Sequence, residues 1–243
     1  MTFKNDYGDY PPSGWHPKTS PDYCGAQKFT EALLGWDLLG FHPKSAWRAD
    51  GLDTSGGLMT YDPLKTRDIK PIGNPDGVAD TLNERKKCYL ELATTNVFRL
   101  GKLFNNTKLL NSDTFVICDA FGVKKIKIEQ TTIKAGTPIL YYRANTSSKN
   151  INLMPLDNRI YDARHNFPLV NLGSVTKDGT PGKPHPLLSD GFPFKFFYGD
   201  FITGAIGYIQ DPKIITPAPP WPYRPDSYLL ISAGLDGKYG TKD

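Results

Sequence analysis

The closing stretch of the sequence, Ser227-Tyr-Leu-Leu-Ile-Ser-Ala-Gly-Leu-Asp-Gly-Lys-Tyr-Gly-Thr-Lys-Asp243, decides how the chain is expected to fold. Tyr228 to Ile231 form an apolar run with β-favouring residues, which predicts a buried strand. The glycines that follow permit positive φ, so the strand is predicted to run into a tight loop with acids at Asp236 and Asp243. A core strand that enters such a loop favours an ion site or a folding lock.

Calcium is the ion that this loop would suit, because Ca²⁺ binds roughly six to eight oxygen atoms from carboxylates and backbone carbonyls. Asp236 and Asp243 offer carboxylates, and the glycines at 234, 237 and 240 allow the backbone carbonyls of Leu235, Lys238 and Thr241 to turn inward. The spacing is not that of an EF-hand, and an ordinary Asp-Gly turn is the alternative. The predicted ligand set is Leu235, Asp236, Lys238, Thr241 and Asp243.

The composition indicates a loop-rich β protein rather than a helix bundle or a disordered chain, because glycine (23), proline (21) and aromatic residues (12%) are abundant among 243 residues. The net charge of +4 is mildly basic. Its one cluster, Lys124, Lys125 and Lys127, alternates like a solvated strand face, so no nucleic-acid partner is expected. No apolar run approaches the roughly 20 residues that span a bilayer.

One helix and an antiparallel sheet are predicted along the chain. A helical pattern runs from about Tyr23 to Leu39, with Asp22 as N-cap and Gly40 at its end. Strands at 114–118, 123–128 and 138–143, with a turn at 135–136, predict an antiparallel meander. Residues 94–103 predict a short helix, 192–209 an aromatic-rich helix or strand pair, and 217–225 a stiff extended connector. No composition break divides the chain, so 1–243 is taken as one domain.

Residues that could carry catalysis form no recognisable motif. Four histidines are scattered in loops and are predicted to be exposed. Cys24, Cys88 and Cys118 form no CxxC pair, which disfavours a zinc ribbon or thioredoxin site and leaves any disulfide pairing open. Paired carboxylates such as Asp119 with Asp157 are not selected by anything in the sequence. The chain is therefore predicted not to be an enzyme.

Three segments, in the expected order, resemble type II secretion major pseudopilins and the prepilin-like proteins of planctomycete-type bacteria. Ile231 to Asp243 resembles their C-terminal SAGPDG-x-x-GT-x-DD loop, and Phe3 to Pro12 resembles their Y-x-x-D-x-G-x-YP segment. Asp119-Ala-Phe-Gly122, with Pro138-Ile-Leu-Tyr-Tyr142 later in the chain, is similar to the D-P-W-G-x-P-Y-x-Y element, although Ala120 stands in place of its proline and residues 123–137 separate the two parts. The helical segment around Glu31-Ala-Leu-Leu34 sits where the family has a short helix.

The resemblance implies an α+β, pilin-like head in which an antiparallel sheet packs on a helix, with long loops and a large insertion at 145–215. It also implies that an apolar N-terminal assembly helix precedes this segment. The function implied is structural: a periplasmic or cell-surface head, anchored in the inner membrane by that helix, which joins itself and other pseudopilins in a pseudopilus. The isolated head is expected to be monomeric, and in this family calcium stabilises the C-terminal loop.

Two alternatives come from other functional classes. A secreted or cell-surface binding module would recognise carbohydrate or protein through aromatic residues of the insertion and its surroundings. A hydrolase with carboxylates in the insertion is the third hypothesis, which a deep acid-lined pocket would support. The aromatic candidates are Trp15, Trp47, Tyr198, Trp221 and Tyr223.

Overall fold

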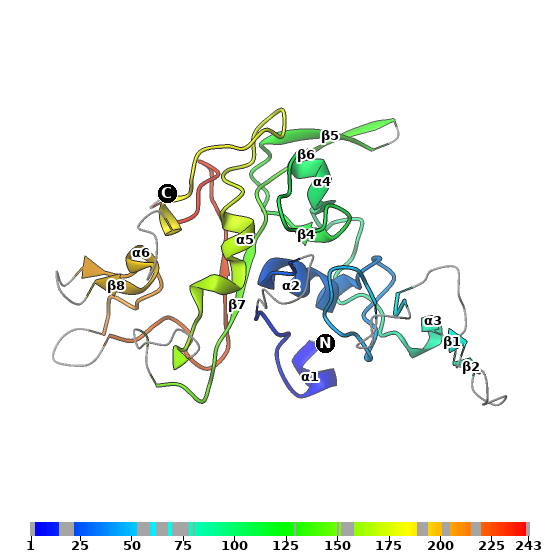
Figure 1. Ribbon diagram of the computed structural model, residues 1–243, viewed down its shortest axis with the longest axis horizontal. Coiled ribbons are helices and arrows are strands. Elements are labelled where there is room, and N and C mark those ends of the chain that lie inside the picture. Colours follow the sequence, from blue (N-terminus) through cyan, green and yellow to red (C-terminus); the bar gives the residue numbers. More distant parts are fainter. Residues whose placement is uncertain are drawn as a thin grey trace.

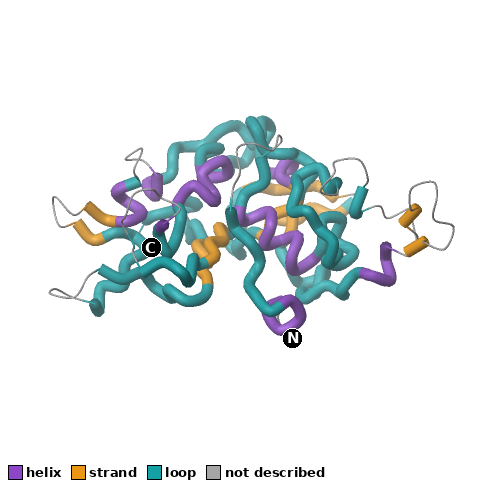
Figure 2. The backbone as a smooth tube through the Cα atoms, turned by 60° about the horizontal axis from the view of Figure 1, so that its bottom comes forward, coloured by secondary structure: helices purple, strands orange, loops and turns teal. Residues whose placement is uncertain are grey.

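Short helices and small antiparallel sheets, joined by long loops, make up the protein (Figures 1 and 2). This mixed architecture confirms the α+β expectation. None of the helices in the described residues is long and apolar enough to span a bilayer. The structure is a computed structural model that describes residues 3–14, 22–52, 59–61, 68–69, 78–79, 81–128, 130–149, 151, 158–188, 194–200, 205–214 and 220–241.

The helices are short apart from α2, which has ten residues. The α-helices are α1 (Phe3–Tyr7), α2 (Gly25–Leu34), α3 (Thr81–Glu84), α4 (Leu100–Leu103), α5 (Phe167–Val170) and α6 (Lys195–Tyr198). Elements η2 (Ala163–Asn166) and η3 (Pro186–Leu188) are 3₁₀ turns.

The strands described by the structure pair in antiparallel twos: β1 with β2, β3 with β4, β5 with β6, β8 with β9, and β7 with β10. Their bounds are β1 (Asp68–Ile69), β2 (Val78–Ala79), β3 (Val97–Arg99), β4 (Phe115–Ile117), β5 (Lys124–Ile128), β6 (Thr131–Ala135), β7 (Leu140–Arg143), β8 (Gly199–Asp200), β9 (Ala205–Ile206) and β10 (Tyr228–Ile231).

Helix α2 packs against β4 and β7 at the centre of the molecule (Figure 1). It is buried on nearly every side, so polar residues lie inside as well as apolar ones. Each needs a partner, because an unpaired buried polar group is costly. Thr30 Oγ1 accepts the backbone N–H of Ile117 at 3.0 Å, and Gln27 Nε2 donates to Thr114 Oγ1 at 2.5 Å. These bonds fix the helix against β4.

Strand β7 is buried on both faces. Alternate side chains of a strand point to opposite sides, so Tyr141 and Tyr142 pack against different elements. The ring of Tyr141 stacks on Phe29 of α2, with 4.8 Å between centroids, whereas Tyr142 contacts Phe197 of α6 at 5.2 Å. The side chain of Asn166 joins α2 to β7, because it accepts a hydrogen bond from Ala26 N (2.8 Å) and donates one to Tyr141 O (2.7 Å). Strand β7 therefore connects α2 to the helices of the second half of the chain.

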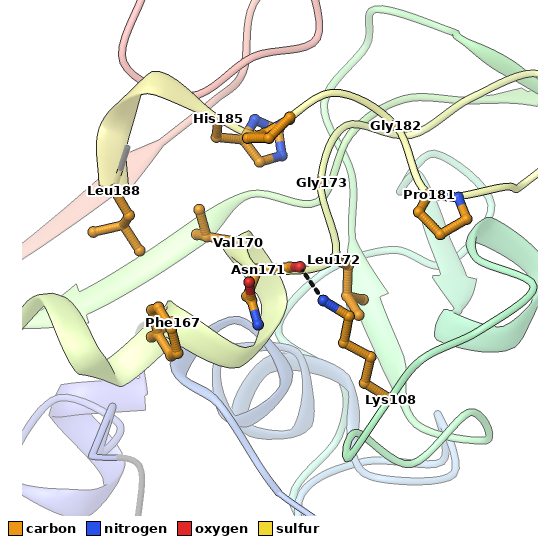
Figure 3. A pocket seen from close by; sticks show the side chains of 11 residues that line it. Lys108, Phe167, Val170, Asn171, Leu172, Gly173, Pro181, Gly182, His185 and Leu188 are labelled. Atoms are coloured by element: carbon orange, nitrogen blue, oxygen red, sulfur yellow. Dashed lines mark hydrogen bonds between the residues drawn. The ribbon is translucent and has the colours of Figure 1, made fainter. Parts of the chain in front are cut away.

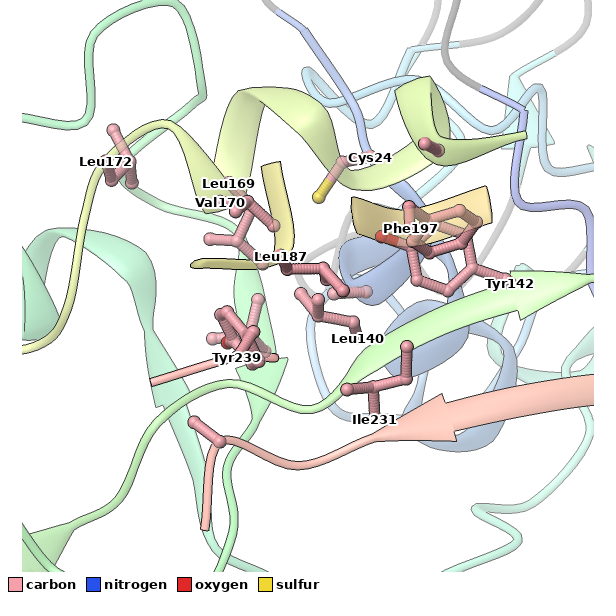
Figure 4. Packing of buried hydrophobic residues seen from close by; sticks show 14 of the residues in the cluster. Cys24, Leu140, Tyr142, Leu169, Val170, Leu172, Leu187, Phe197, Ile231 and Tyr239 are labelled. Atoms are coloured by element: carbon pink, nitrogen blue, oxygen red, sulfur yellow. The ribbon is translucent and has the colours of Figure 1, made fainter. Parts of the chain in front are cut away.

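The main core gathers residues from both halves of the sequence (Figure 4). Ile160, Leu169 and Leu187 belong to it, so the predicted 145–215 insertion contributes to the central packing. A smaller cluster centres on Phe3 of α1 and Phe41, with centroids 5.0 Å apart. Figure 4 shows main-core members from elements distant in sequence, among them Cys24, Leu140, Tyr142, Leu169, Leu187, Phe197, Ile231 and Tyr239.

Several local predictions were wrong. The central helix begins after Cys24, which is its N-cap, and ends at Leu34, because Gly35 adopts φ +87°. The segment predicted as a helix at 94–103 contains strand β3 before α4. The predicted meander is absent from the described sheets: β5 pairs with β6, and β7 pairs with the final strand β10. Strands β4, β5, β7 and β10 themselves were predicted correctly.

Candidate functional site at the C-terminal loop

The loop after β10 is anchored to the core through a buried carboxylate, Asp119. Ser232 Oγ donates to Asp119 Oδ2 at 2.9 Å. The other oxygen, Oδ1, accepts the backbone N–H groups of Thr137 (3.1 Å) and Phe121 (3.2 Å). Burial raises the pKa of Asp119 against these hydrogen bonds, which lower it. One side chain thus ties the end of β10 to the segments that follow β4 and precede β7.

Tyr239 brings the loop back into the core, where it is 1% exposed. Its hydroxyl donates to the carbonyl oxygen of Pro138. Its backbone N–H donates to His185 Nδ1 at 3.1 Å, and its carbonyl accepts the N–H of Leu187 at 3.0 Å. The ring centroids of Tyr239 and His185 lie 4.4 Å apart. The loop is therefore held both by the chain before β7 and by η3.

Gly240 allows this close approach. Its φ is +92°, a backbone conformation that residues other than glycine rarely adopt. A Cβ added at this position would lie 2.7 Å from the backbone nitrogen of Leu187. A glycine at this position is thus required by both the backbone and the packing.

Three residues of the predicted ligand set, Asp236, Lys238 and Thr241, lie together, but Thr241 does so through its side-chain hydroxyl, whereas the prediction used its backbone carbonyl. Asp236 Oδ1 accepts the N–H of Lys238 at 2.9 Å, and the Thr241 hydroxyl lies 3.2 Å from Asp236 Oδ1 and 3.0 Å from the Lys238 carbonyl oxygen. The side chain of Leu235 is 79% exposed. Asp243 lies outside the described residues. The Asp236 carboxylate accepting a backbone N–H two residues on is also the pattern of an ordinary Asp turn.

These oxygen donors fit a hard cation in kind, because carboxylate, carbonyl and hydroxyl oxygens are what Ca²⁺ binds. They supply only part of the shell that calcium requires. Among the described residues, no group of three or more His, Cys, Asp or Glu side chains could hold a metal.

A pocket of about 330 Å³ lies beside this loop, between α5 and the residues before η3 (Figure 3). His185 lines it, and burial lowers the pKa of this histidine to about 4, so its ring is neutral at pH 7. Lys108 Nζ donates to the carbonyl of Asn171 at 2.6 Å at another side of the pocket. The pocket contains no carboxylate among its lining residues.

No family model, characterised protein or solved structure matches this chain.

The histidines differ from the prediction that all are exposed. His42 and His185 are buried at 1% and 3% exposure, and His165 is half-buried. His16 lies outside the described residues. Sequence patterns gave no signal for this burial, since each of these histidines stands next to loop-forming residues.

Ser13, His165 and Asp162 adjoin one another as in a hydrolase triad, but they lack its arrangement. Ser13 Oγ lies 2.8 Å from His165 Nδ1, and His165 Nε2 lies 3.7 Å from Asp162 Oδ2. Ser13 is 2% exposed and its Oγ accepts the N–H of Arg143. Asp162 is bound by the guanidinium of Arg164. Because Ser13 is buried, its hydroxyl is not open to a substrate in this conformation.

Glu31 is a buried carboxylate that sequence reasoning assigned only to a helix. It accepts hydroxyl hydrogen bonds from Tyr23 (2.7 Å), Tyr61 (2.8 Å) and Ser45. Burial raises its pKa, and these hydrogen bonds oppose that rise. Because all three donors are engaged by one carboxylate, the cluster reads as a structural tie between α2 and the 42–61 region.

An aromatic groove of about 410 Å³ lies between α1, α2 and β10, away from the C-terminal loop. Tyr10 and Tyr228 meet edge-on at 5.0 Å, and Tyr141 lies 6.0 Å from Tyr228. Of the aromatic residues proposed for the alternative binding function, Trp47, Tyr198, Trp221 and Tyr223 do not line this groove. Tyr198 is buried and Tyr223 is 42% exposed. Trp221 packs against the main core, and Trp47 packs against the smaller cluster of Phe3 and Phe41. Trp15 lies outside the described residues, as does the carboxylate candidate Asp157.

Proposed function

We propose that this chain is the head of a pseudopilin-like structural subunit, which joins copies of itself and other pseudopilins in a type II secretion or type IV pilus-like filament. In this proposal the head lies in the periplasm or at the cell surface. An apolar helix encoded upstream anchors the subunit in the inner membrane before assembly. The chain acts by holding its shape in the filament rather than by catalysis.

The observation that carries this proposal is the way the C-terminal loop is built. Ser232, Tyr239 and Gly240 are each used to hold the loop against the core. The same stretch has the strongest resemblance to pseudopilins, whose C-terminal loop stabilises the head. A loop whose polar groups bind other groups of the same chain, a carboxylate in the case of Ser232 and a backbone carbonyl in the case of Tyr239, suits a structural subunit.

Calcium is part of the proposal. A Ca²⁺ ion would take the Asp236 carboxylate, the Lys238 carbonyl and the Thr241 oxygen, which already converge. In the proposed site Leu235 and Asp243 complete the ligand set. Since the ion would bind only the folded loop, it would add to the stability of the head.

The test of the filament proposal is expression of the complete gene, with its upstream coding sequence, in a host that supplies a prepilin peptidase and a filament assembly system. The upstream sequence is expected to encode an apolar helix after a prepilin cleavage site. The chain is expected in the sheared filament fraction, and the isolated head is expected to sediment as a monomer. An upstream sequence without such a helix, or a chain that stays out of filaments, would contradict the proposal.

A binding module for carbohydrate or protein is the second candidate. The aromatic groove is the feature that favours this function, and it replaces the 145–215 insertion as the proposed binding surface. Clustered aromatic faces bind sugar rings and extended peptides. A glycan or peptide array would test this function. Binding abolished by Tyr228→Ala but retained by Trp221→Ala would place it at the groove, and no binding by the parent chain would remove this candidate.

A further inference from the structure

The β5–β6 hairpin projects from the body of the protein (Figure 1) and has two dissimilar faces. Residues directly opposite in an antiparallel pair share a face, and successive residues alternate. Lys125 lies opposite Lys134, and Lys127 is two residues from Lys125 on the same face. All three lysines are exposed. One face of the hairpin is therefore basic.

The other face carries Ile126, Ile128 and Ile133 together with Lys124 and Thr131, and it emerges from the core toward the hairpin end. The ammonium group of Lys124 is turned to the carbonyl oxygen of Leu103, at 3.1 Å. Ile126, opposite Ile133, is 4% exposed and belongs to the main core. Ile133 itself is 39% exposed, and Ile128 is 47% exposed. The outer half of this face thus presents two isoleucines to solvent beside three lysines on the reverse.

The lysine arrangement costs stability in the free protein. Like charges directly opposite one another in a sheet repel, as do Lys125 and Lys134. In the described part of the chain, no carboxylate pairs with Lys125, Lys127 or Lys134. An anionic partner would relieve this repulsion, so the charge pattern favours a partner of negative charge.

We propose that the β5–β6 hairpin is a membrane-contact element that lies on an anionic phospholipid surface. An amphipathic segment with lysines on one face and apolar residues on the other lies in the bilayer interface, its apolar side chains below the headgroups. The long lysine side chains reach the phosphates around a ribbon only two strands wide. A nucleic acid would engage the lysines but would leave Ile128 and Ile133 in water, so the lipid surface accounts for both faces.

The contact is expected to be weak and reversible. Each lysine near an anionic surface strengthens binding about five-fold at moderate salt, and the effect falls with ionic strength. The two half-exposed isoleucines are each expected to add a further factor of about five. The contact does not depend on filament assembly, so its failure would leave the proposed structural role untouched.

Co-sedimentation of the whole 243-residue chain with lipid vesicles tests the proposal. The chain is expected to bind vesicles that contain about one-third phosphatidylglycerol and to leave pure phosphatidylcholine vesicles unbound. Replacing Lys125, Lys127 and Lys134 by Gln should weaken binding about 100-fold, following the five-fold effect per lysine. Ile128→Ser with Ile133→Ser should weaken it about 25-fold at unchanged charge.

The matched control replaces three exposed lysines elsewhere, Lys102, Lys177 and Lys183, by Gln and should bind like the parent within about two-fold. The hairpin lysine variant should melt no lower than the parent, because it removes a like-charge pair. Three results would overturn the proposal. The parent chain could fail to bind anionic vesicles, the two lysine variants could lose vesicle affinity equally, or the isoleucine variant could bind vesicles like the parent. Tighter binding to a labelled DNA duplex than to vesicles, through the same lysines, would replace lipid by nucleic acid.

Discussion

The hydroxyl of Tyr239 offers the sharpest test of how the C-terminal loop is held. In Tyr239→Phe the ring keeps its place against His185, but the Pro138 carbonyl loses its hydrogen bond inside the core. Leaving a buried acceptor without this donor costs about 1–3 kcal/mol. For a chain of this length each kcal/mol shifts the melting temperature by about 2–4 °C. We expect a loss of about 2 kcal/mol and a melting temperature lower by about 4–8 °C.

Urea unfolding followed by tryptophan fluorescence measures this loss directly. The matched control is Tyr223→Phe, whose side chain is 42% exposed and whose unfolding free energy should change by less than about 0.5 kcal/mol. Equal stability of Tyr239→Phe and the parent would refute the reasoning, because it would mean that the loop is not held through Pro138.

Three further variants probe other contacts of the fold. Burial lowers the pKa of His185 from 6.5 to about 4, so the unfolded chain binds a proton at a higher pH than the folded chain does. The unfolding free energy should therefore fall by up to about 3 kcal/mol as the pH falls from 6.5 to 4. In urea titrations at a series of pH values, His185→Gln should lack this loss. Glu31→Ala should cost about 3 kcal/mol or more by removing the common acceptor of buried hydroxyls, a loss that Glu31→Gln should partly restore; equal losses would contradict this role. Gly240→Ala should cost about 2 kcal/mol, whereas alanine at the exposed, negative-φ Gly101 should cost less; the reverse order in thermal unfolding would contradict the account of Gly240.

The sequence predicted those elements whose signals are local. The apolar run before Ser232 became β10, and the alternating residues from Lys124 became β5. Strand β6 was missed because Thr131 to Ala135 carries mostly polar, exposed side chains, so its only apolar guide was Ile133. Leu230 is 47% exposed although its run predicts a buried strand, and the sequence gives no sign of this exposure.

Contacts between distant segments were beyond sequence reasoning. Nothing local specifies that Ser232 meets Asp119, or that Tyr239 meets His185, because each pairing depends on how β7 and β10 come together. Helix α2 shows a second limit. Its predicted apolar face implied one buried side, yet Glu31 is buried too, since the residues that cover it come from elsewhere in the chain. The approach of Asp236 to Lys238 was predictable, because an Asp turn fixes it locally, whereas the prediction did not include the contacts of the Thr241 hydroxyl.

The most direct test of the C-terminal loop as a calcium-stabilised structural element is a thermal-unfolding titration with Ca²⁺ and with EDTA. At a calcium concentration about 100 times the dissociation constant, binding adds about 2.7 kcal/mol, which raises the melting temperature by about 5–10 °C. Asp236→Ala should lose this rise, whereas the control Asp113→Ala, at an exposed carboxylate, should keep it. If neither Ca²⁺ nor EDTA moves the melting temperature, and Asp236→Ala melts like the parent, the loop holds no calcium and the predicted ligands form only a turn.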